Sequence, residues 1–266
     1  MTILNNMTFH IITLFPKAFS SYLGESILKR AIEDKKIKVK FYNPRDYVKN
    51  KHLRIDRKPY GGGPGMVIQA EPVIKAVEAA LKESRIKNHE LKKRGEKLQT
   101  TNYKLQTKII WLSPSGKQFT NKYARKAAKQ AADVIIICGR YEGIDARVKK
   151  VINSTPIYLP AIAKRRPWQA GEAGRMTRIK VEEMSVGPFV LTGGELPAMI
   201  MIDVISRQIP GILGDFTSLE EERVASPNVY TRPEVFEYKC KKYRVPKVLL
   251  SGHHKKIEEW KKKFVV

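Results

Sequence analysis

Short apolar runs alternate with amphipathic segments along much of the sequence. The runs FHIITLF (residues 9–15), IIWL (109–112) and VIIIC (134–138) are almost entirely apolar. Between them lie an amphipathic stretch ending near residue 33, a strand pattern at 37–42, a helical pattern from about residue 71, and an Ala- and Lys-rich helical pattern ending near residue 132. Apolar strands that alternate with helices are typical of a parallel sheet covered on both faces. We therefore expect an α/β fold.

The charge of the chain indicates a polyanionic partner. The 266 residues include 51 Lys and Arg against 26 Asp and Glu, a formal net charge of +25 (51 − 26). This excess is far more than solubility requires, so nucleic acid is the first candidate partner and a membrane surface is the competing one. No uninterrupted apolar stretch reaches the roughly 18 to 20 residues of a membrane span, and the N-terminal segment lacks a charged signal region and a cleavage site. We expect a cytoplasmic protein that does not bind membranes.

The cysteines and histidines do not have the spacing of a metal site. Cys138 and Cys240 are far apart in the sequence, and of the five His only His253 and His254 are adjacent. Two isolated cysteines fit a reducing compartment, and a structural zinc site would need a tighter cluster of ligands. The sequence therefore predicts no structural zinc site.

Three basic segments look like additions to the α/β pattern. Residues 82–108 hold nine Lys or Arg against three acids and repeat the letters KLQT, which indicates a solvated, partly flexible excursion. Residues 152–181 are also basic and contain Trp168 with several Pro and Gly, which suits a long ordered loop better than a helix. Residues 239–263 carry ten bases against two acids and end in the helical pattern KKIEEWKKKF.

Several glycine-containing motifs adjoin these elements. GGGPG (61–65) and SPSG (113–116) are weak signals, because glycines often serve only to turn a chain and neither motif is a nucleotide phosphate loop. CGRYEGID (138–145) is more informative, since it follows a buried strand, where open α/β sheets bind their ligands; capping of a helix is the alternative role for its polar side chains.

A further glycine pair precedes an unusually apolar helical pattern at residues 198–209. Asp203 and Arg207 lie four residues apart there in the favourable order, so an intrahelical ion pair is the simplest expectation. Most of the neighbouring positions are apolar: Met199, Ile200, Ile202, Val204 and Ile205. We expect this helix to be buried by the core or by a second subunit.

The order of the motifs carries a family resemblance. In sequence the chain contains PYGGGPGMV, LSPSG, CGRYEGIDARV, SVGPFVLTGGELPAM, IDVISRQIPG, YTRPEV and VPKVLLSGHH. Together they closely resemble the bacterial tRNA (guanine-37-N1)-methyltransferases of TrmD type, which belong to the SPOUT class. The resemblance covers almost the whole chain except the inserts at about 82–108 and 152–181.

The resemblance implies a fold and a domain organisation. Residues 1–211 would form an α/β knot, a parallel sheet with a deep trefoil knot that holds S-adenosylmethionine in a bent conformation. Residues 212–227 would be a linker, and 228–266 a small, basic, mainly helical domain that binds tRNA. The implied assembly is a homodimer in which the linker of one subunit completes the pocket of the other.

The resemblance also implies the positions of the cofactor pocket. Much of this pocket would be backbone and apolar surface, which suits a cofactor whose reactive sulfonium needs shelter from water. Glycines would allow backbone groups to approach the adenine closely where a Cβ would intrude. The implied positions are Leu112, Pro114, Gly139, Tyr141, Glu142, Val186, Gly187, Phe189, Leu191, Gly193, Gly194 and Pro197.

A catalytic pair and a substrate follow from the same resemblance. Arg207 matches the family's catalytic arginine, and Glu222 falls where the family has the aspartate that takes the N1 proton of guanine 37 in the anticodon stem-loop of tRNA. Guanine N1 carries a proton and is a poor nucleophile, so a carboxylate must remove the proton while a cation stabilises negative charge on O6. The family is often described as assisted by Mg²⁺, although this sequence contains no recognisable magnesium site. DNA is not an expected partner.

Two departures from the family pattern leave alternatives open. Pro188 stands beside the cofactor loop where the family usually has an aspartate, and the linker after Glu222 is shorter than usual. One alternative is a SPOUT methyltransferase that acts on another RNA position. The other is a non-catalytic relative that binds RNA.

Overall fold

The structure is a computed structural model that describes residues 7–93, 106–154, 180–213 and 228–263, the side chains of 85–93 and 106 excepted. Contacts divide the chain into two compact units, Met1–Ile212 and Leu213–Val266. Within the described part of the chain, no helix is both long and apolar enough to cross a membrane.

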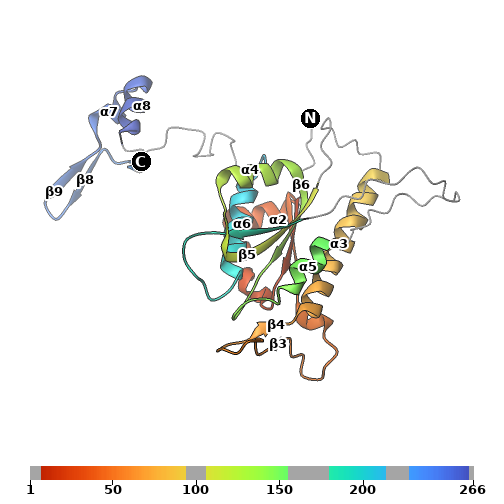
Figure 1. Ribbon diagram of the computed structural model, residues 1–266. Helices are drawn as coiled ribbons and strands as arrows, with labels where there is room; N and C mark the ends of the chain where they lie inside the picture. Colours follow the sequence, from red (N-terminus) through yellow and green to blue (C-terminus); the bar gives the residue numbers. More distant parts are fainter. Residues whose placement is uncertain (1–6, 94–105, 155–179, 214–227, 264–266) are drawn as a thin grey trace. The chain divides into compact units, whose positions relative to one another are not determined.

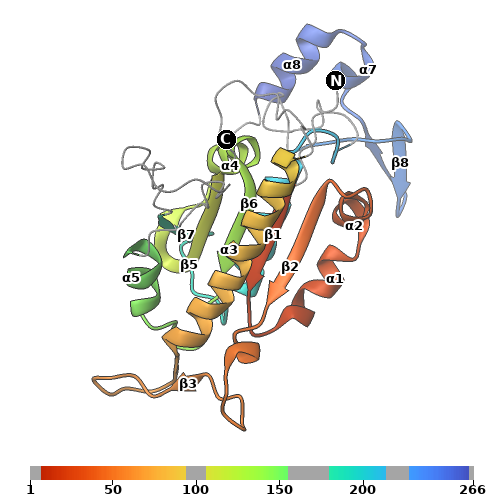
Figure 2. The same ribbon diagram turned by 90° about the vertical axis from the view of Figure 1, so that its right-hand side faces the viewer.

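A five-stranded sheet forms the centre of the first unit. Its strand order is β2-β1-β6-β5-β7, and every neighbouring pair is parallel (Figure 2). The strands are β1 (Met7–Ile12), β2 (Ile37–Tyr42), β5 (Gln106–Gln118), β6 (Ala131–Ile137) and β7 (Val181–Ser185). A separate short ribbon pairs β3 (Asp56–Arg57) with β4 (Val67–Ile68). The α/β fold with a parallel sheet that the sequence predicts is therefore confirmed.

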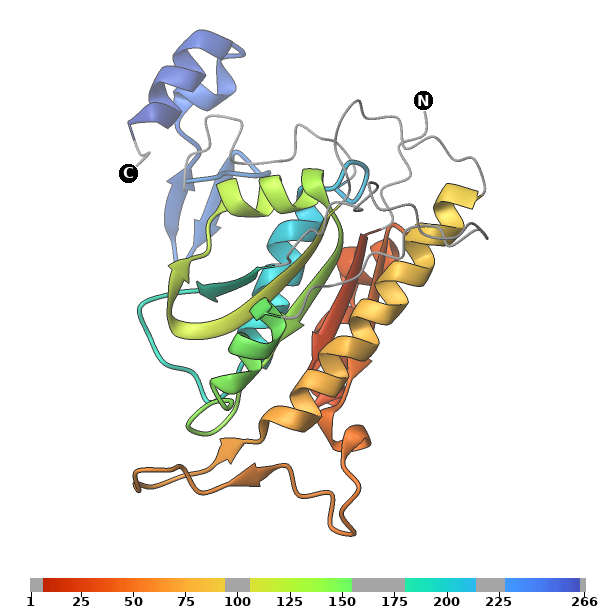
Figure 3. The same cartoon turned by 45° about the vertical axis from the view of Figure 1, so that its right-hand side comes forward.

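Helices cover both faces of this sheet. On one face α1 (Ser20–Leu23), α2 (Ser26–Glu33), α4 (Asn121–Gln130) and α6 (Glu195–Arg207) pack on the first core cluster. On the other face α3 (Ala70–Lys93) and α5 (Arg147–Ser154) pack on the second cluster (Figure 3). Two 3-10 turns, Pro16–Phe19 and Pro44–Tyr47, complete the unit.

The central strands have no polar alternation because both of their faces are buried. In β6, Val134 and Ile136 belong to the first core cluster, whereas Ile135 and Ile137 belong to the second. Successive side chains of a strand point to opposite faces, so a strand between two helical layers is apolar at most positions. The run VIIIC is the direct result.

Strand β5 is longer than the apolar run IIWL, because it pairs with β6 and then continues along β7. Leu112 and Lys117 both pair with Met184, so the intervening SPSG segment bulges out of the ladder. Gly116 lies where the bulge comes close to the backbone of β7: an added Cβ would be 2.5 Å from the backbone nitrogen of Met184. This glycine permits the bulge.

Part of the expected basic excursion at 82–108 is regular structure. Helix α3 continues to Lys93 and β5 begins at Gln106, so only 94–105 fall outside the described residues.

A buried polar network begins at Ser84 of α3. Ser84 is buried and donates a hydrogen bond to Asp133 Oδ2 (2.9 Å). Asp133 Oδ1 lies 3.2 Å from His10 Nε2, and His10 Nδ1 lies 2.8 Å from the Tyr42 hydroxyl. A buried polar network thus joins α3 to three strands.

The second unit combines a hairpin with two helices. Strands β8 (Val235–Tyr238) and β9 (Lys241–Arg244) are antiparallel, and α7 (Lys247–Leu250) and α8 (His254–Lys262) follow them (Figure 1). The rings of Tyr230 and Trp260 lie 6.2 Å apart and hold α8 against the segment before the hairpin. The helical pattern predicted near the C-terminus is present, whereas the hairpin was not predicted.

Candidate functional site

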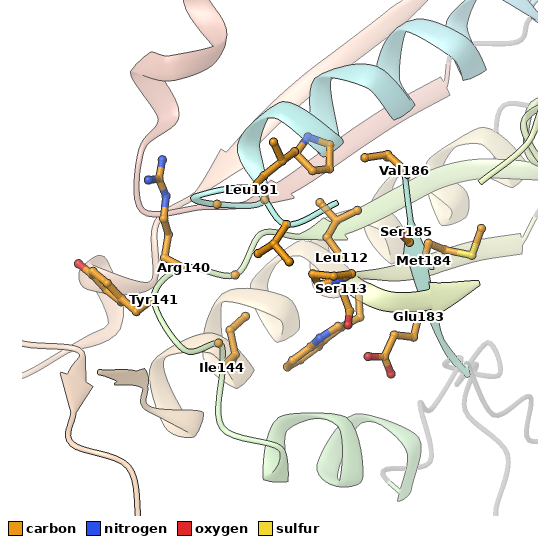
Figure 4. Close-up of a pocket in the computed structure, with 18 of the residues that line it drawn as sticks. Leu112, Ser113, Arg140, Tyr141, Ile144, Glu183, Met184, Ser185, Val186 and Leu191 are labelled. Carbon is orange, nitrogen blue, oxygen red and sulfur yellow. The ribbon is translucent and has the colours of Figure 1, made fainter. Parts of the chain in front are cut away.

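A cavity of about 470 Å³ lies where the carboxyl ends of β5, β6 and β7 meet the start of α6 (Figure 4). Open parallel sheets bind their ligands at this edge, because the loops after several strands converge there. Eleven of the twelve positions expected for the cofactor line the cavity: Leu112, Pro114, Gly139, Tyr141, Glu142, Val186, Phe189, Leu191, Gly193, Gly194 and Pro197. Residues from three motifs that are far apart in the sequence therefore meet at one site.

Gly187 is the expected position that does not line the cavity. It lies in a turn in which Ser185 donates its hydroxyl hydrogen to the Gly187 carbonyl (2.9 Å). An added Cβ at Gly187 would collide with the ring of Phe189. Gly187 therefore supports the loop that places Val186 and Phe189 at the cavity.

The glycine pair before α6 packs directly against the end of β6. The Gly194 amide donates to the Gly139 carbonyl at 2.9 Å, and a Cβ added at Gly194 would lie 2.7 Å from the Cα of Cys138. A Cβ added at Gly193 would collide with Arg140 Nε and lie 2.6 Å from Glu195 Oε2. Side chains at either position would displace the wall of the cavity.

A nearly buried carboxylate fixes this wall. Glu195 accepts hydrogen bonds from Thr13 Oγ1 and from Arg140 Nε, each at 2.9 Å. The Arg140 guanidinium also lies 4.6 Å from the centroid of the Phe15 ring. Burial, followed by the negative charge of Glu195, raises the pKa of the Cys138 thiol well above its usual value. Cys138 is therefore held as a neutral thiol in the core.

The loop at 138–145 also contacts the glycine-rich motif at 61–65. The Glu142 amide donates to the Met66 carbonyl at 3.1 Å, and the Ile68 amide donates to the Gly143 carbonyl at 3.0 Å. A Cβ added at Gly65 would collide with the Glu142 side chain. Tyr141 has a positive φ of 59° in this loop and lines the cavity. Two motifs that are far apart in the sequence therefore support each other.

One polar group at the cavity has no signal in the sequence. Lys149 Nζ lies 2.9 Å from Glu183 Oε2 and 5.1 Å from the centroid of the Trp111 ring, and all three residues line the cavity. Burial alone would raise the pKa of Glu183, but hydrogen bonds from Lys149 and Ser113 outweigh it, so this pKa is lowered. The group forms only because α5 packs beside β7. Spacing along the chain could not have revealed it.

Arg207 lies at the opposite end of α6 from the cavity. The intrahelical ion pair expected between Asp203 and Arg207 is absent from the ion pairs of the described residues, so that expectation is wrong. Asp203 instead accepts a hydrogen bond from the hydroxyl of Tyr22 at 2.8 Å. This bond is also the main reason why the pKa of Tyr22 is raised. Glu222, the expected proton acceptor, lies outside the described residues.

Metal ligation is the remaining chemistry to consider. In the parts of the chain that the structure describes, no three His, Cys, Asp or Glu side chains are grouped so that they could hold a metal ion.

Comparisons with known proteins agree on one family. The sequence model described as tRNA (Guanine-1)-methyltransferase TrmD matches residues 7–162 and 167–265. A protein of Alkaliphilus oremlandii named tRNA (guanine-N(1)-)-methyltransferase is 38% identical over 260 residues, which cover 96% of this chain and 86% of the relative. Proteins of the same name from Clostridioides difficile and Carboxydothermus hydrogenoformans are each 39% identical, over 96% and 97% of this chain and 91% and 82% of the relatives.

Proposed function

Because the chain belongs to the tRNA (guanine-1)-methyltransferase TrmD family, we infer that it is an enzyme that methylates N1 of a guanine in tRNA. We further propose that the guanine is at position 37, in the anticodon stem-loop, and that S-adenosylmethionine is the methyl donor. The cavity at the start of α6 carries this proposal, because it gathers eleven of the twelve expected cofactor positions from three separate motifs.

The residues at the cavity fit S-adenosylmethionine. Its volume of about 470 Å³ lies within the range of about 300 to 1,000 Å³ that is common for small-molecule sites. Leu112, Val186 and Leu191 supply apolar surface, while Gly193 and Gly194 leave backbone groups open to close approach. When bound, this cofactor supplies an electrophilic methyl group on a sulfonium. The lining residues would bind it and exclude water.

Glu222 and Arg207 are the proposed catalytic pair. The Glu222 carboxylate would accept the proton of guanine N1 and leave an electron pair on N1 for the new bond to the methyl carbon; the bond from that carbon to sulfur would break at the same time, and its electrons would return to the sulfur as a neutral thioether. The Arg207 guanidinium would stabilise the negative charge that develops on guanine O6. No covalent enzyme intermediate is needed, and the buried thiol of Cys138 has no role in this scheme.

The position of Arg207 supports a shared active site. Helix α6 has 13 residues, so its two ends are about 20 Å apart, with the cavity at one end and Arg207 at the other. Within one chain, α6 therefore holds Arg207 away from the cavity of that chain. The exposed apolar side chains of Leu196 and Ile200 lie on the same helix and suit burial by a second copy. We propose a homodimer in which one subunit completes the site of the other.

Further parts of the proposal follow from family membership. The parallel sheet would contain the deep trefoil knot of the SPOUT class, within a methyltransferase domain of residues 1–211. Residues 212–227 would be the linker, and the basic domain at 228–266 would bind tRNA. The proposed location is the cytoplasm. Methyl transfer with and without a chelator tests the assistance by Mg²⁺ that the family resemblance implies.

Transfer of a labelled methyl group to tRNA transcripts tests this function. A transcript with guanine at position 37 should accept the label, and a control with adenine at that position should not. Transfer to both transcripts would contradict the choice of position 37 and favour a SPOUT enzyme with another RNA site. Binding of S-adenosylmethionine without transfer to either transcript would favour a non-catalytic RNA-binding relative.

A further inference from the structure

The β8–β9 hairpin has an exposed aromatic face. Its register pairs Phe236 with Tyr243 and Tyr238 with Lys241, and side chains two residues apart on a strand share a face. Phe236, Tyr238 and Tyr243 therefore project from the same side, and we call these three residues the aromatic face. Their exposed fractions are 55%, 55% and 54%. Clustered exposed rings of this kind mark a binding surface.

The orientation of these rings suits planar ligands. The planes of Phe236 and Tyr238 differ by only 9°, and their centroids lie 6.3 Å apart. Tyr243 lies across the ladder from Phe236, with a centroid distance of 6.4 Å and a tilt of 37°. A flat group that stacks on Tyr238 therefore meets a second ring in nearly the same orientation.

Positive charge surrounds the same rings. Residues 238–247 contain five bases and no acid. Lys239 Nζ lies 5.4 Å from the centroid of the Tyr238 ring, and Lys241 shares the aromatic face. Glu237, the acid that is nearest in the sequence, points to the other face, where its Oε2 lies 3.9 Å from Lys242 Nζ. A ligand on the aromatic face would meet unopposed cations.

Stacking rings beside cations match the chemistry of single-stranded nucleic acid. Aromatic side chains stack on bases of any sequence, while Lys and Arg contact the phosphates between them. Base-paired RNA does not offer free base faces, so unpaired nucleotides are the matching ligand. Lysine is depleted at protein interfaces, so Lys239 and Lys241 beside the rings favour nucleic acid over a protein partner.

We propose that the aromatic face of the β8–β9 hairpin binds unpaired nucleotides of tRNA by base stacking, with Lys239 and Lys241 beside the adjoining phosphates. The choice of tRNA rests on the proposed function, whereas single-stranded RNA as the ligand class rests on the hairpin alone. The hairpin would thus hold a non-helical part of the substrate while the cavity in the first unit holds the cofactor.

Replacement of one ring in the full-length chain tests this binding. Tyr238→Leu removes the aromatic ring but keeps an apolar side chain, and Tyr238→Phe is the matched control that keeps the ring. Tyr238→Leu should weaken binding of a labelled oligouridylate by about 5-fold or more, since stacking contributes about 1 to 3 kcal/mol per base. Tyr238→Phe should bind like the wild type, and neither variant should alter binding of an RNA duplex of equal length. Phe236→Leu provides an independent repeat.

The salt dependence separates stacking from charge. Tyr238→Leu should leave the slope of log affinity against log salt unchanged, whereas Lys241→Gln should make it shallower, because it removes one phosphate contact. Equal binding by Tyr238→Leu and Tyr238→Phe would overturn the proposal. A changed oligomeric state or unfolding transition in Tyr238→Leu would also overturn it, because another protein surface would then cover the rings.

The same variants distinguish this inference from the proposed enzyme activity. If the wild type does not methylate tRNA but its oligouridylate affinity still depends on the Tyr238 ring, the enzyme proposal fails and the hairpin proposal stands. If methylation proceeds with the same tRNA KM in Tyr238→Leu, the hairpin proposal fails and the enzyme proposal stands.

Discussion

Arg140 Nε lies 2.9 Å from Glu195 Oε2, and this ion pair joins the loop after β6 to the first turn of α6. The Glu195 side chain is only 4% exposed, so its charge depends on the few partners that it has. Thr13 donates to its other carboxylate oxygen and links the end of β1 to the same point. The position of the cavity wall therefore depends on one carboxylate, which joins its own helix to two other segments.

Loss of the Glu195 carboxylate should destabilise the first unit. Glu195→Ala leaves the buried hydroxyl of Thr13 without its acceptor, and we expect the free energy of unfolding to fall by roughly 2 kcal/mol. Glu195→Gln should be milder, because its amide oxygen still accepts from Thr13. Urea unfolding measures both effects, with the exposed Glu33→Ala as the control. An equal loss in Glu33→Ala would show that the network around Glu195 does not stabilise the fold.

Valine at position 193 should abolish detectable binding of S-adenosylmethionine in a folded protein. Its Cβ would collide with Arg140 Nε and crowd Glu195, so both the ion pair and the wall of the cavity would move. Calorimetry measures the affinity, and thermal unfolding verifies the fold. Gly194→Ala is the informative comparison, because its Cβ meets backbone atoms of Cys138 and should also lower the Tm. Unchanged affinity in folded Gly193→Val would mean that the cofactor binds elsewhere.

Alkaline pH should destabilise the protein partly through Tyr42. Burial, with smaller contributions from Tyr47 and Asp133, raises the pKa of Tyr42 to about 12, compared with 10.0 in an unfolded chain. The folded state therefore favours the neutral phenol, so this contribution is complete below pH 10 and is lost as the pH rises through about 12. Tyr42→Phe should reduce the fall in unfolding free energy between pH 10 and 12. Urea titrations across this range measure it.

Tyr60→Phe is the matched control for this pH effect, since the Tyr60 side chain is fully exposed. Its pH profile should follow that of the wild type. Equal profiles for Tyr42→Phe and the wild type would contradict the assignment to Tyr42. At neutral pH, Tyr42→Phe should also be less stable by about 1 kcal/mol, because it loses hydrogen bonds to His10 and Glu83.

The affinity for tRNA should fall steeply as salt rises, because each neutralised phosphate releases bound counterions. The net charge of +25 provides many such contacts. Neutralising Lys164, Arg165 and Arg166, which lie outside the described residues, should make the slope of log affinity against log salt shallower. Filter binding over a salt series measures the slope. A slope near zero in the wild type would argue against a polyanionic substrate.

The sequence predicted the sheet because burial on both faces leaves a strong apolar pattern. The hairpin β8–β9 was not predicted, since its strands have four residues each and its turn lacks the usual Asn or Gly. Lys239 and Cys240 occupy the turn with φ values of 46° and 60°, a conformation normally signalled by Asn-Gly. The pairing of the two strands therefore accommodates a turn that the local sequence does not signal.

In the candidate site, too, residues within motifs were predicted, whereas contacts that depend on the packing of distant elements were not. Its glycines and apolar positions were predicted from the family resemblance, and close backbone approach explains why glycine is needed at several of them. The Lys149–Glu183 pair could not be predicted, since it joins residues 34 positions apart through the packing of α5 beside β7. The expected Asp203–Arg207 pair failed for a related reason: the Tyr22 hydroxyl, from α1, binds Asp203 instead.

Glu222 provides the sharpest test of the proposed chemistry. Glu222→Gln keeps the shape of the side chain but cannot accept the N1 proton, and a general base commonly contributes about 10² to 10⁴ in rate. We expect single-turnover methylation to fall by about 10² or more, while the affinity for S-adenosylmethionine stays nearly unchanged. Its neighbour Glu221 gives the matched control, and Glu221→Gln should be much milder. Equal activity of the two variants, or a loss of activity only in Glu221→Gln, would place the base at another residue of the linker.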